Sequence, residues 1–231
     1  MRYPLDERVF HYGLAGGACD PNVGVKGGWP QFVGFTTVAE IAAILATTIV
    51  LDVGGAHGKG GDGNILLNEL KDGYMVAWSA GGVAVNRRIV SNTAVVGGGE
   101  MTITVDKPIP IALAVNTDHI ELMANPYMNL QSDPVTYNDF NPYLGIPALA
   151  AVEGQYLWIQ TWGPVWCSPG GTGQIGVANN NRKAVFRNDG SVDAVEETDA
   201  ITVRNQFAGF VYATAITPGQ GAPFIYLMIA P

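Results

Sequence analysis

The sequence predicts a mainly β protein, built as one or two small β-barrel or β-sandwich domains with an extended N-terminal arm. The first observation is that short segments rich in β-branched and aromatic residues recur along the chain, with Gly and Pro between them. The second is the glycine content, 30 of 231 residues, which is about twice the usual share. The third is the length of 231 residues, which fits one large all-β domain or two small ones.

Residues 1–35 are expected to form the arm. One short strand is predicted at residues 8–12, and the Gly and Pro residues after it prevent regular structure of any length. The segment is nevertheless too aromatic for a disordered tail. We therefore expect it to lie along another surface and to be ordered only when bound there. The residues expected to contact a partner or another subunit are Arg8, Phe10, Tyr12, Trp29 and Phe32.

The first β domain is expected over residues 36–130. Residues 38–46 predict a short helix, because they are mostly apolar, Thr36 or Thr37 could cap the start, and Glu40 falls in the first turn. β-branched residues then predict a strand. The strands expected in this domain are residues 47–51, 74–78, 83–90, 101–105, 111–115 and 119–123.

The second β domain is expected over residues 131–231. An irregular segment at residues 124–146, with its Asn-Pro and Asp-Pro pairs, marks the boundary. Further along, Asn188, Asp189 and Gly190 predict a hairpin turn. The strands expected in this domain are residues 155–162, 184–186, 200–203, 207–216 and 224–229.

Charged residues are scarce and mostly acidic. They make up 14% of the chain, and the net charge is −8. Basic residues are too few to neutralise a phosphate backbone, so no nucleic-acid partner is expected. The longest apolar stretch, residues 41–51, falls well short of the ~20 residues that cross a bilayer. We therefore expect that the chain does not associate with a membrane and that it is made in the cytoplasm. With only two cysteines, far apart in the sequence, we also expect Cys19 and Cys167 to be free thiols rather than a disulfide.

Sequence motifs for catalysis or cofactor binding are weak. Residues 58–63 (GKGGDG) match the pattern G-x-G-x-x-G, but too few residues follow before the next turn for the helix that a dinucleotide site requires, so a loop is expected. His11, His57 and His119 each lack a second ligand at metal-binding spacing. No catalytic residue, metal site or cofactor is therefore expected, and the chain is expected not to be an enzyme.

One segment of the second domain has an unusual concentration of aromatic residues: Tyr156, Trp158, Trp162 and Trp166. Alternate residues of a strand share a face, so the first three of these are expected on one face and Leu157 on the other. Because both faces are apolar, one interpretation is a core strand that is buried on both sides. The other is an aromatic platform, either for stacking on sugar rings or for a protein interface.

Several segments resemble a family of small structural proteins of tailed bacteriophages, which are typically encoded near the major capsid protein. The likeness covers the chain in order from residue 8 to about residue 165, and the segment at residues 156–164 is the most specific. Residues 38–46 look inserted, and the last 60 residues or so differ most. The matching segments are residues 8–12 (RVFHY), 72–76 (DGYMV), 101–108 (MTITVDKP), 125–127 (NPY), 145–147 (GIP) and 156–164 (YLWIQTWGP).

The resemblance implies a component of the virion head, a decoration (cement) protein bound to the capsid exterior. Its implied partner is the major capsid protein, and such proteins are often trimeric, so a homotrimer is the favoured oligomer. The alternative is a tail or fibre module that binds a host glycan through Trp158, Trp162 and Trp166. A β-fold enzyme such as a glycan hydrolase is a further alternative, but no pair of carboxylates is singled out by the sequence.

Overall fold

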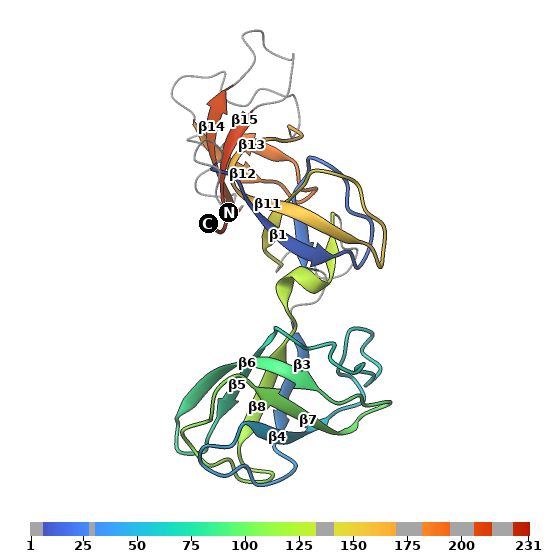
Figure 1. Cartoon of the computed structure of the whole chain (residues 1–231), viewed down its shortest axis with the longest axis vertical. Coiled ribbons are helices and arrows are strands. Elements are labelled where there is room, and N and C mark those ends of the chain that lie inside the picture. Colours follow the sequence, from blue (N-terminus) through green and yellow to red (C-terminus); the bar gives the residue numbers. More distant parts are fainter. Residues whose placement is uncertain (1–6, 28–30, 133–140, 170–181, 195–205, 214–223) are drawn as a thin grey trace. The chain divides into compact units, whose positions relative to one another are not determined.

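The computed structural model describes residues 7–27, 31–132, 141–169, 182–194, 206–213 and 224–231 (Figure 1). In these ranges the chain is nearly all β and forms two curled antiparallel sheets that resemble half-barrels. The prediction of a mainly β protein is therefore confirmed. The chain divides into unit 1, residues 1–28 and 127–231, and unit 2, residues 29–126.

Unit 2 is an insertion within unit 1. Strand β2 (Val25–Gly27) precedes the insertion and β9 (Leu130–Gln131) follows it, and the two strands pair with each other. This division differs from the expected one, in which an arm and two consecutive domains follow each other along the chain. A pairing between segments about 100 residues apart cannot be read from local sequence patterns.

The described part of the expected arm belongs to both units, since β1 (Val9–Leu14) and β2 are in the sheet of unit 1 and residues 31–35 are in β3 (Gln31–Thr37) of unit 2. Strand β1 (Val9–Leu14) runs antiparallel to β11 (Tyr156–Trp166), and Figure 1 shows the two strands side by side. The glycines that follow β1 do not separate the segment from the sheet but allow close packing, since a Cβ at Gly17 would lie 2.9 Å from the Gln131 side chain and one at Gly24 2.7 Å from that of Tyr143. The other strands of this sheet are β10 (Tyr143–Pro147), β12 (Lys183–Phe186), β13 (Val192–Ala194), β14 (Phe207–Ala213) and β15 (Phe224–Met228).

The predicted hairpin turn at residues 188–191 is confirmed, since it joins β12 to β13. Gly190 has φ of +80°, and a Cβ there would lie 2.5 Å from the carbonyl oxygen of Gly24. Tyr143 holds this turn in place, because its hydroxyl donates to the carbonyl of Arg187 and accepts from the N–H of Gly190 at 3.0 Å. Its ring stacks on Phe186, which is fully buried.

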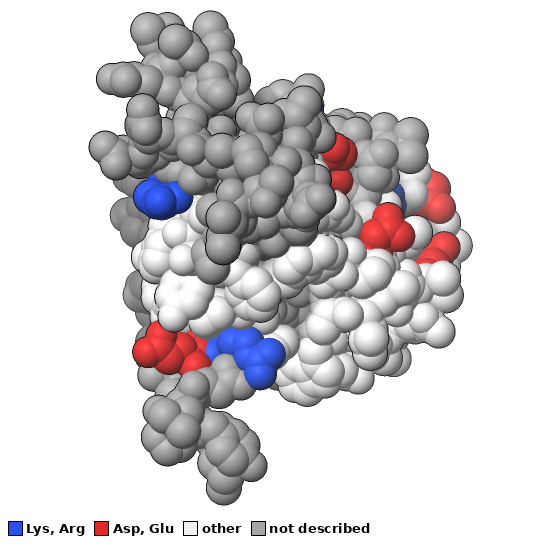
Figure 2. Space-filling model, turned by 90° about the horizontal axis from the view of Figure 1, so that it is seen from above, with Lys and Arg blue, Asp and Glu red and all other residues white. Residues whose placement is uncertain are grey.

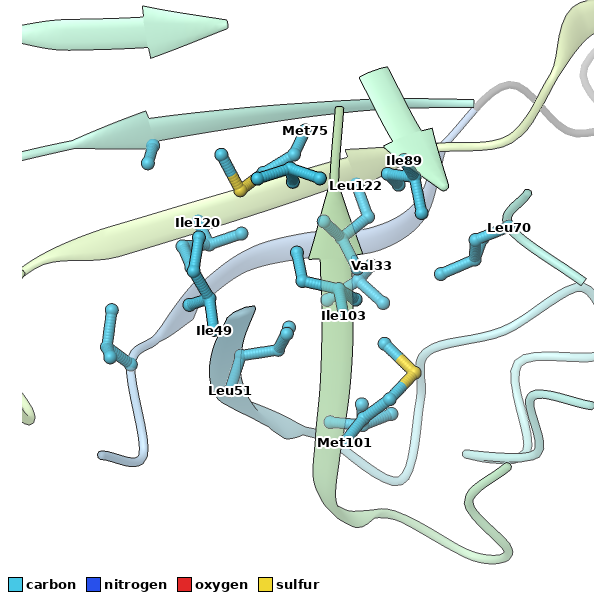
Figure 3. Close-up of a cluster of buried hydrophobic side chains, with 14 of the residues drawn as sticks. Val33, Ile49, Leu51, Leu70, Met75, Ile89, Met101, Ile103, Ile120 and Leu122 are labelled. Carbon is cyan, nitrogen blue, oxygen red and sulfur yellow. The ribbon is translucent and has the colours of Figure 1, made fainter. Parts of the chain in front are cut away.

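Unit 2 is a six-stranded sheet in the order β3-β8-β5-β6-β7-β4. Backbone bridging between Val38 and Leu51 connects the ends of this order, and the sheet curls around its own core. Alternate residues of each strand point inward, as Ile103, Met75 and Leu122 do in Figure 3. The strands are β3 (Gln31–Thr37), β4 (Thr48–Val53), β5 (Tyr74–Trp78), β6 (Ala84–Asn92), β7 (Gly99–Val105) and β8 (His119–Met123).

The helix predicted at residues 38–46 is absent, so that prediction is wrong. The N–H groups of this segment bond to distant carbonyls instead, from Ala42 to Leu113 and from Leu45 to Ile109. Pairing with remote segments therefore replaces the i to i−4 bonds of a helix. Leu45 has φ of +69°, which no α-helix contains.

The remaining strand predictions differ in outcome. The strand expected at residues 111–115 is wrong, because only Leu113 forms an isolated bridge there. The strand expected at residues 155–162 is longer than predicted, since β11 continues to Trp166. The strand expected at residues 200–203 and the end of the one expected at residues 207–216 lie outside the described residues.

We predict that a fragment of residues 29–126 folds without the rest of the chain. Its core is its own, and the pairing of Gln31 with Met123 brings its two ends together. The expected result is a β-type circular dichroism spectrum with a cooperative thermal transition. The complementary variant, with residues 29–126 replaced by a short Gly/Ser linker, is expected to keep the fold of unit 1. A fragment without a cooperative transition would contradict the prediction.

Candidate functional site

The most distinctive surface of the described residues is an aromatic face on unit 1, centred on β11. Side chains of β11 alternate, so that Leu157 and Ile159 are buried whereas Tyr156 and Trp158 are each 58% exposed. The interpretation of β11 as a core strand buried on both sides is therefore wrong for this half of the strand. The aromatic face is defined by Tyr12 of β1, Tyr156, Trp158, Trp162 and Trp166 of β11, Phe224 and Tyr226 of β15, and Phe210 of β14.

Strand pairing brings these side chains together at one end of the face. Tyr12 lies opposite Trp158 in the register of β1 and β11, and paired residues project to the same side. The ring of Tyr12 is parallel to that of Tyr156, with centroids 5.2 Å apart and an interplanar angle of 1°. Its centroid is 4.9 Å from that of Trp158, at a tilt of 54°. The three rings therefore support one another, although all three are exposed.

A second group of rings continues the aromatic face along the sheet. Trp162 meets the edge of Tyr226 with centroids 5.9 Å apart, and Phe210 stacks on Tyr226 at 5.1 Å. Trp166 is paired with Phe224 at the end of β11, and both are exposed. The rings thus follow β11 from residue 156 to residue 166, a length of about 33 Å at ~3.3 Å per residue.

Two hydrogen-bonding side chains along this face, those of Gln160 and Tyr226, bond within the molecule. Gln160, between Trp158 and Trp162, is buried and its side-chain amide donates to main-chain carbonyls, among them that of Pro164 at 2.9 Å. The hydroxyl of Tyr226 donates to the Glu7 carboxylate, which raises the pKa of Tyr226. The face therefore presents mainly ring surface.

Charge is sparse around the aromatic face. Arg8 lies over the ring of Phe10 at 5.8 Å, and Lys183 lies 5.9 Å from the ring of Phe207. Among the described residues visible in Figure 2, broad white surface lies between the Lys, Arg, Asp and Glu side chains. A surface with exposed aromatic rings and little charge has the composition of the centre of a protein interface.

The structure separates the contact residues predicted for the arm. Phe10 and Tyr12 are in β1 of unit 1, where Tyr12 is part of the aromatic face, and Arg8 directly precedes this strand. Phe32 is in β3 of unit 2, and its side chain is outside what the structure describes. Trp29 also lies outside the described residues. The predicted aromatic cluster of β11 is thus joined by Tyr12, which only the pairing of β1 with β11 could have revealed.

The glycine-rich segment at residues 58–63 is a loop, as expected. Its conformation is fixed by Asn64, whose backbone N–H and side-chain amide both donate to the Asp62 carboxylate and hold the pKa of Asp62 below its usual range. Asn64 also accepts a bond from the N–H of Gly97, at 2.9 Å. Local bonds of this kind account for the motif without a ligand.

The described residues contain no group of three or more His, Cys, Asp or Glu side chains that could hold a metal ion. His57 accepts a bond at Nδ1 from the N–H of Gly54, and partial burial lowers its pKa. Within the same ranges, no helix has the length and apolar character needed to cross a membrane.

Comparison with protein-family models, with curated proteins and with solved structures yields no match for this chain.

Cys19 and Cys167 are both buried and do not form a disulfide, as predicted, and they belong to different core clusters. Burial and, secondarily, Asp20 raise the pKa of Cys19 to about 11, and burial raises the pKa of Cys167 to about 12.

We predict that neither thiol reacts with a thiol-specific reagent at pH 8 in the folded protein, and that both react in denaturant. Since the unfolded thiols ionise near pH 9, their contribution to stability is complete below pH 9 and is lost as the pH rises through about 11 and 12. Rapid labelling of native protein would contradict this.

Proposed function

We propose that the chain is a non-enzymatic structural protein of a phage virion, which binds the outer surface of the capsid and stabilises it. The observation that carries the proposal is the aromatic face of unit 1. Tyr and Trp are the residues that most often dominate binding energy at protein interfaces, and here they are exposed on a rigid sheet.

The size of the aromatic face favours a protein partner. Its rings extend for about 33 Å along β11, whereas one sugar ring would cover only a small part of that length. A standard protein interface buries ~800 Å² on each partner. A surface of this length, carried on several paired strands, is suited to a contact of that size.

The chemistry of the aromatic face also favours a protein partner. Gln160 turns its amide toward the main chain, so a sugar stacked between Trp158 and Trp162 would lack that group as a hydrogen-bond partner. Sugars need such groups for their hydroxyls. The order of sequence segments that resembles phage head proteins adds support for the major capsid protein as the partner.

Many copies on a symmetric shell would strengthen a modest contact through avidity. We further propose that the chain forms a homo-oligomer on the capsid, with a trimer favoured. Under this proposal the protein is made in the host cytoplasm and resides on the virion exterior.

Binding to capsids tests the proposal directly. Purified protein is mixed with expanded empty capsids of its own virus, and bound copies are counted after sedimentation. We expect saturable binding at a copy number related to capsid symmetry. Trp158→Ala is expected to weaken binding about 30-fold or more, since truncating a central aromatic anchor costs about 2 kcal/mol or more. Phe35→Ala, which removes an exposed ring from unit 2, is the matched control and is expected to bind normally.

A second candidate function is the binding of a host glycan by the aromatic face, and the exposure of Trp158 favours it. The same experiment separates the two. Protein that fails to bind capsids but is recovered on tails or host cells, with Trp158→Ala abolishing that recovery, would reject the decoration role in favour of the glycan-binding module.

A further inference from the structure

Unit 2 carries a second exposed surface, which differs in chemistry from the aromatic face. It is formed by the outward residues of the neighbouring strands β8, β5 and β6, together with Phe35 of β3. Register aligns these residues in rows, because Trp78 pairs with His119 and Ala84, Val76 with Glu121 and Asn86, and Tyr74 with Met123 and Arg88. The mixed face is defined by these residues: Phe35, Tyr74, Val76, Trp78, Ala84, Asn86, Arg88, His119, Glu121 and Met123.

The first row of the mixed face is a stack of rings. Phe35 is 62% exposed and lies on His119 with centroids 3.9 Å apart and an interplanar angle of 11°. Trp78 also contacts Phe35, with ring centroids 5.8 Å apart at a tilt of 49°. Phe35 is therefore an exposed ring that two neighbouring rings support.

The next rows add polar groups at regular spacing. Glu121 and Asn86 flank Val76, two residues along the strands from the stack, which is about 6.7 Å. Tyr74, 46% exposed, and the exposed Arg88 follow after a further step of the same length. A row of rings, a row with a carboxylate and an amide, and a row with a second ring thus follow one another over about 13 Å.

The backbone beneath the mixed face is fixed. The inward neighbours Met75, Ala77 and Ile120 are fully buried in the core of unit 2, which Figure 3 shows for Met75 and Ile120. Asp118, which precedes His119, is buried and accepts bonds from the N–H groups of Ala80 and Ala114, both at 2.7 Å. The strands that carry the mixed face are therefore fixed before any ligand arrives, which lowers the entropy lost on binding.

We propose that the mixed face binds a neutral oligosaccharide. A pyranose ring has an apolar side, which stacks on an aromatic ring, and hydroxyl groups around its edge, which bond to carboxylate, amide and guanidinium groups. The mixed face presents both kinds of group in alternation at the scale of a short run of linked pyranose rings. The aromatic face of unit 1 lacks this alternation, so the two surfaces are suited to different partners.

Charge argues against single-stranded nucleic acid as the ligand of the mixed face. Single-stranded nucleic acid also stacks on aromatic side chains, but it requires a basic groove along its phosphates. Glu121 lies in the middle of the mixed face, Arg88 is 3.8 Å from Asp72, and the chain has a net charge of −8. These negative charges oppose a polyanion and leave a neutral saccharide unaffected. The site goes beyond the proposed capsid role and does not depend on it.

The test is an array of immobilised neutral oligosaccharides built from glucose, galactose, mannose and N-acetylglucosamine, probed with the labelled full chain. Each hit is then measured by isothermal titration calorimetry. Phe35→Ala and Trp78→Ala are expected to weaken binding about tenfold or more, and Glu121→Gln severalfold, because it replaces a charged acceptor by an amide. Phe35→Tyr, which keeps the ring, is expected to retain binding. Trp158→Ala on unit 1 is the matched control and is expected to leave it unchanged.

Circular dichroism and thermal unfolding establish that each variant is folded. An array without any bound oligosaccharide overturns the proposal, as does binding that persists in Phe35→Ala and Trp78→Ala. Loss of saccharide binding in Trp158→Ala alone would assign the sugar to unit 1 instead. The proposal is also overturned if single-stranded DNA competes with the oligosaccharide for the mixed face, or if the mixed face captures only a protein partner. Capsid binding is measured separately, so failure of one proposal leaves the other intact.

Discussion

Unit 1 depends on β11, because strands β1, β10 and β15 all pair with this single strand. Thr161, at its middle, is fully buried, donates its hydroxyl to the carbonyl of Ala230 at 2.7 Å and lies 3.5 Å from the carbonyl of Val9. Segments from both ends of the described chain are thus fixed to the same residue. Gly163 allows the first of them to approach, because a Cβ there would lie 3.0 Å from the backbone of Arg8, and its φ is +89°.

The same strand produces the aromatic face as a consequence of its alternation. Its inward residues must fill the core shared with Leu130 and Val25, and its outward residues cannot reach that core. Large rings on the outward side therefore stay exposed unless another surface covers them. These exposed rings do not contribute to the buried core. A large exposed apolar patch marks an interaction site, so we propose that they serve binding.

The sequence was informative where structure is local. Alternation predicted the strand at residues 101–105, and Asn188, Asp189 and Gly190 predicted their turn, because both signals lie within a few residues. It misled at residues 38–46, where helix-forming residues instead make bonds to Leu113 and Ile109. It could not show that Tyr12 stacks on Tyr156, since that contact depends on a strand pairing across about 140 residues. The sequence therefore predicts the four rings of β11 in the aromatic face. It does not predict which rings of other strands lie beside them.

The insertion of unit 2 explains how one chain can present two chemically different surfaces. Because unit 2 has its own core, substitutions of its outward-facing residues are expected to have little effect on the packing of unit 1. Polar groups such as Glu121 and Asn86 can then lie among rings on one unit, while Gln160 is turned inward on the other. We propose that the outward polar groups of unit 2 serve a hydroxylated ligand and that the aromatic face of unit 1, where Gln160 is turned inward, serves a protein partner. The direction of these few polar side chains, more than the number of aromatic rings, distinguishes the two surfaces.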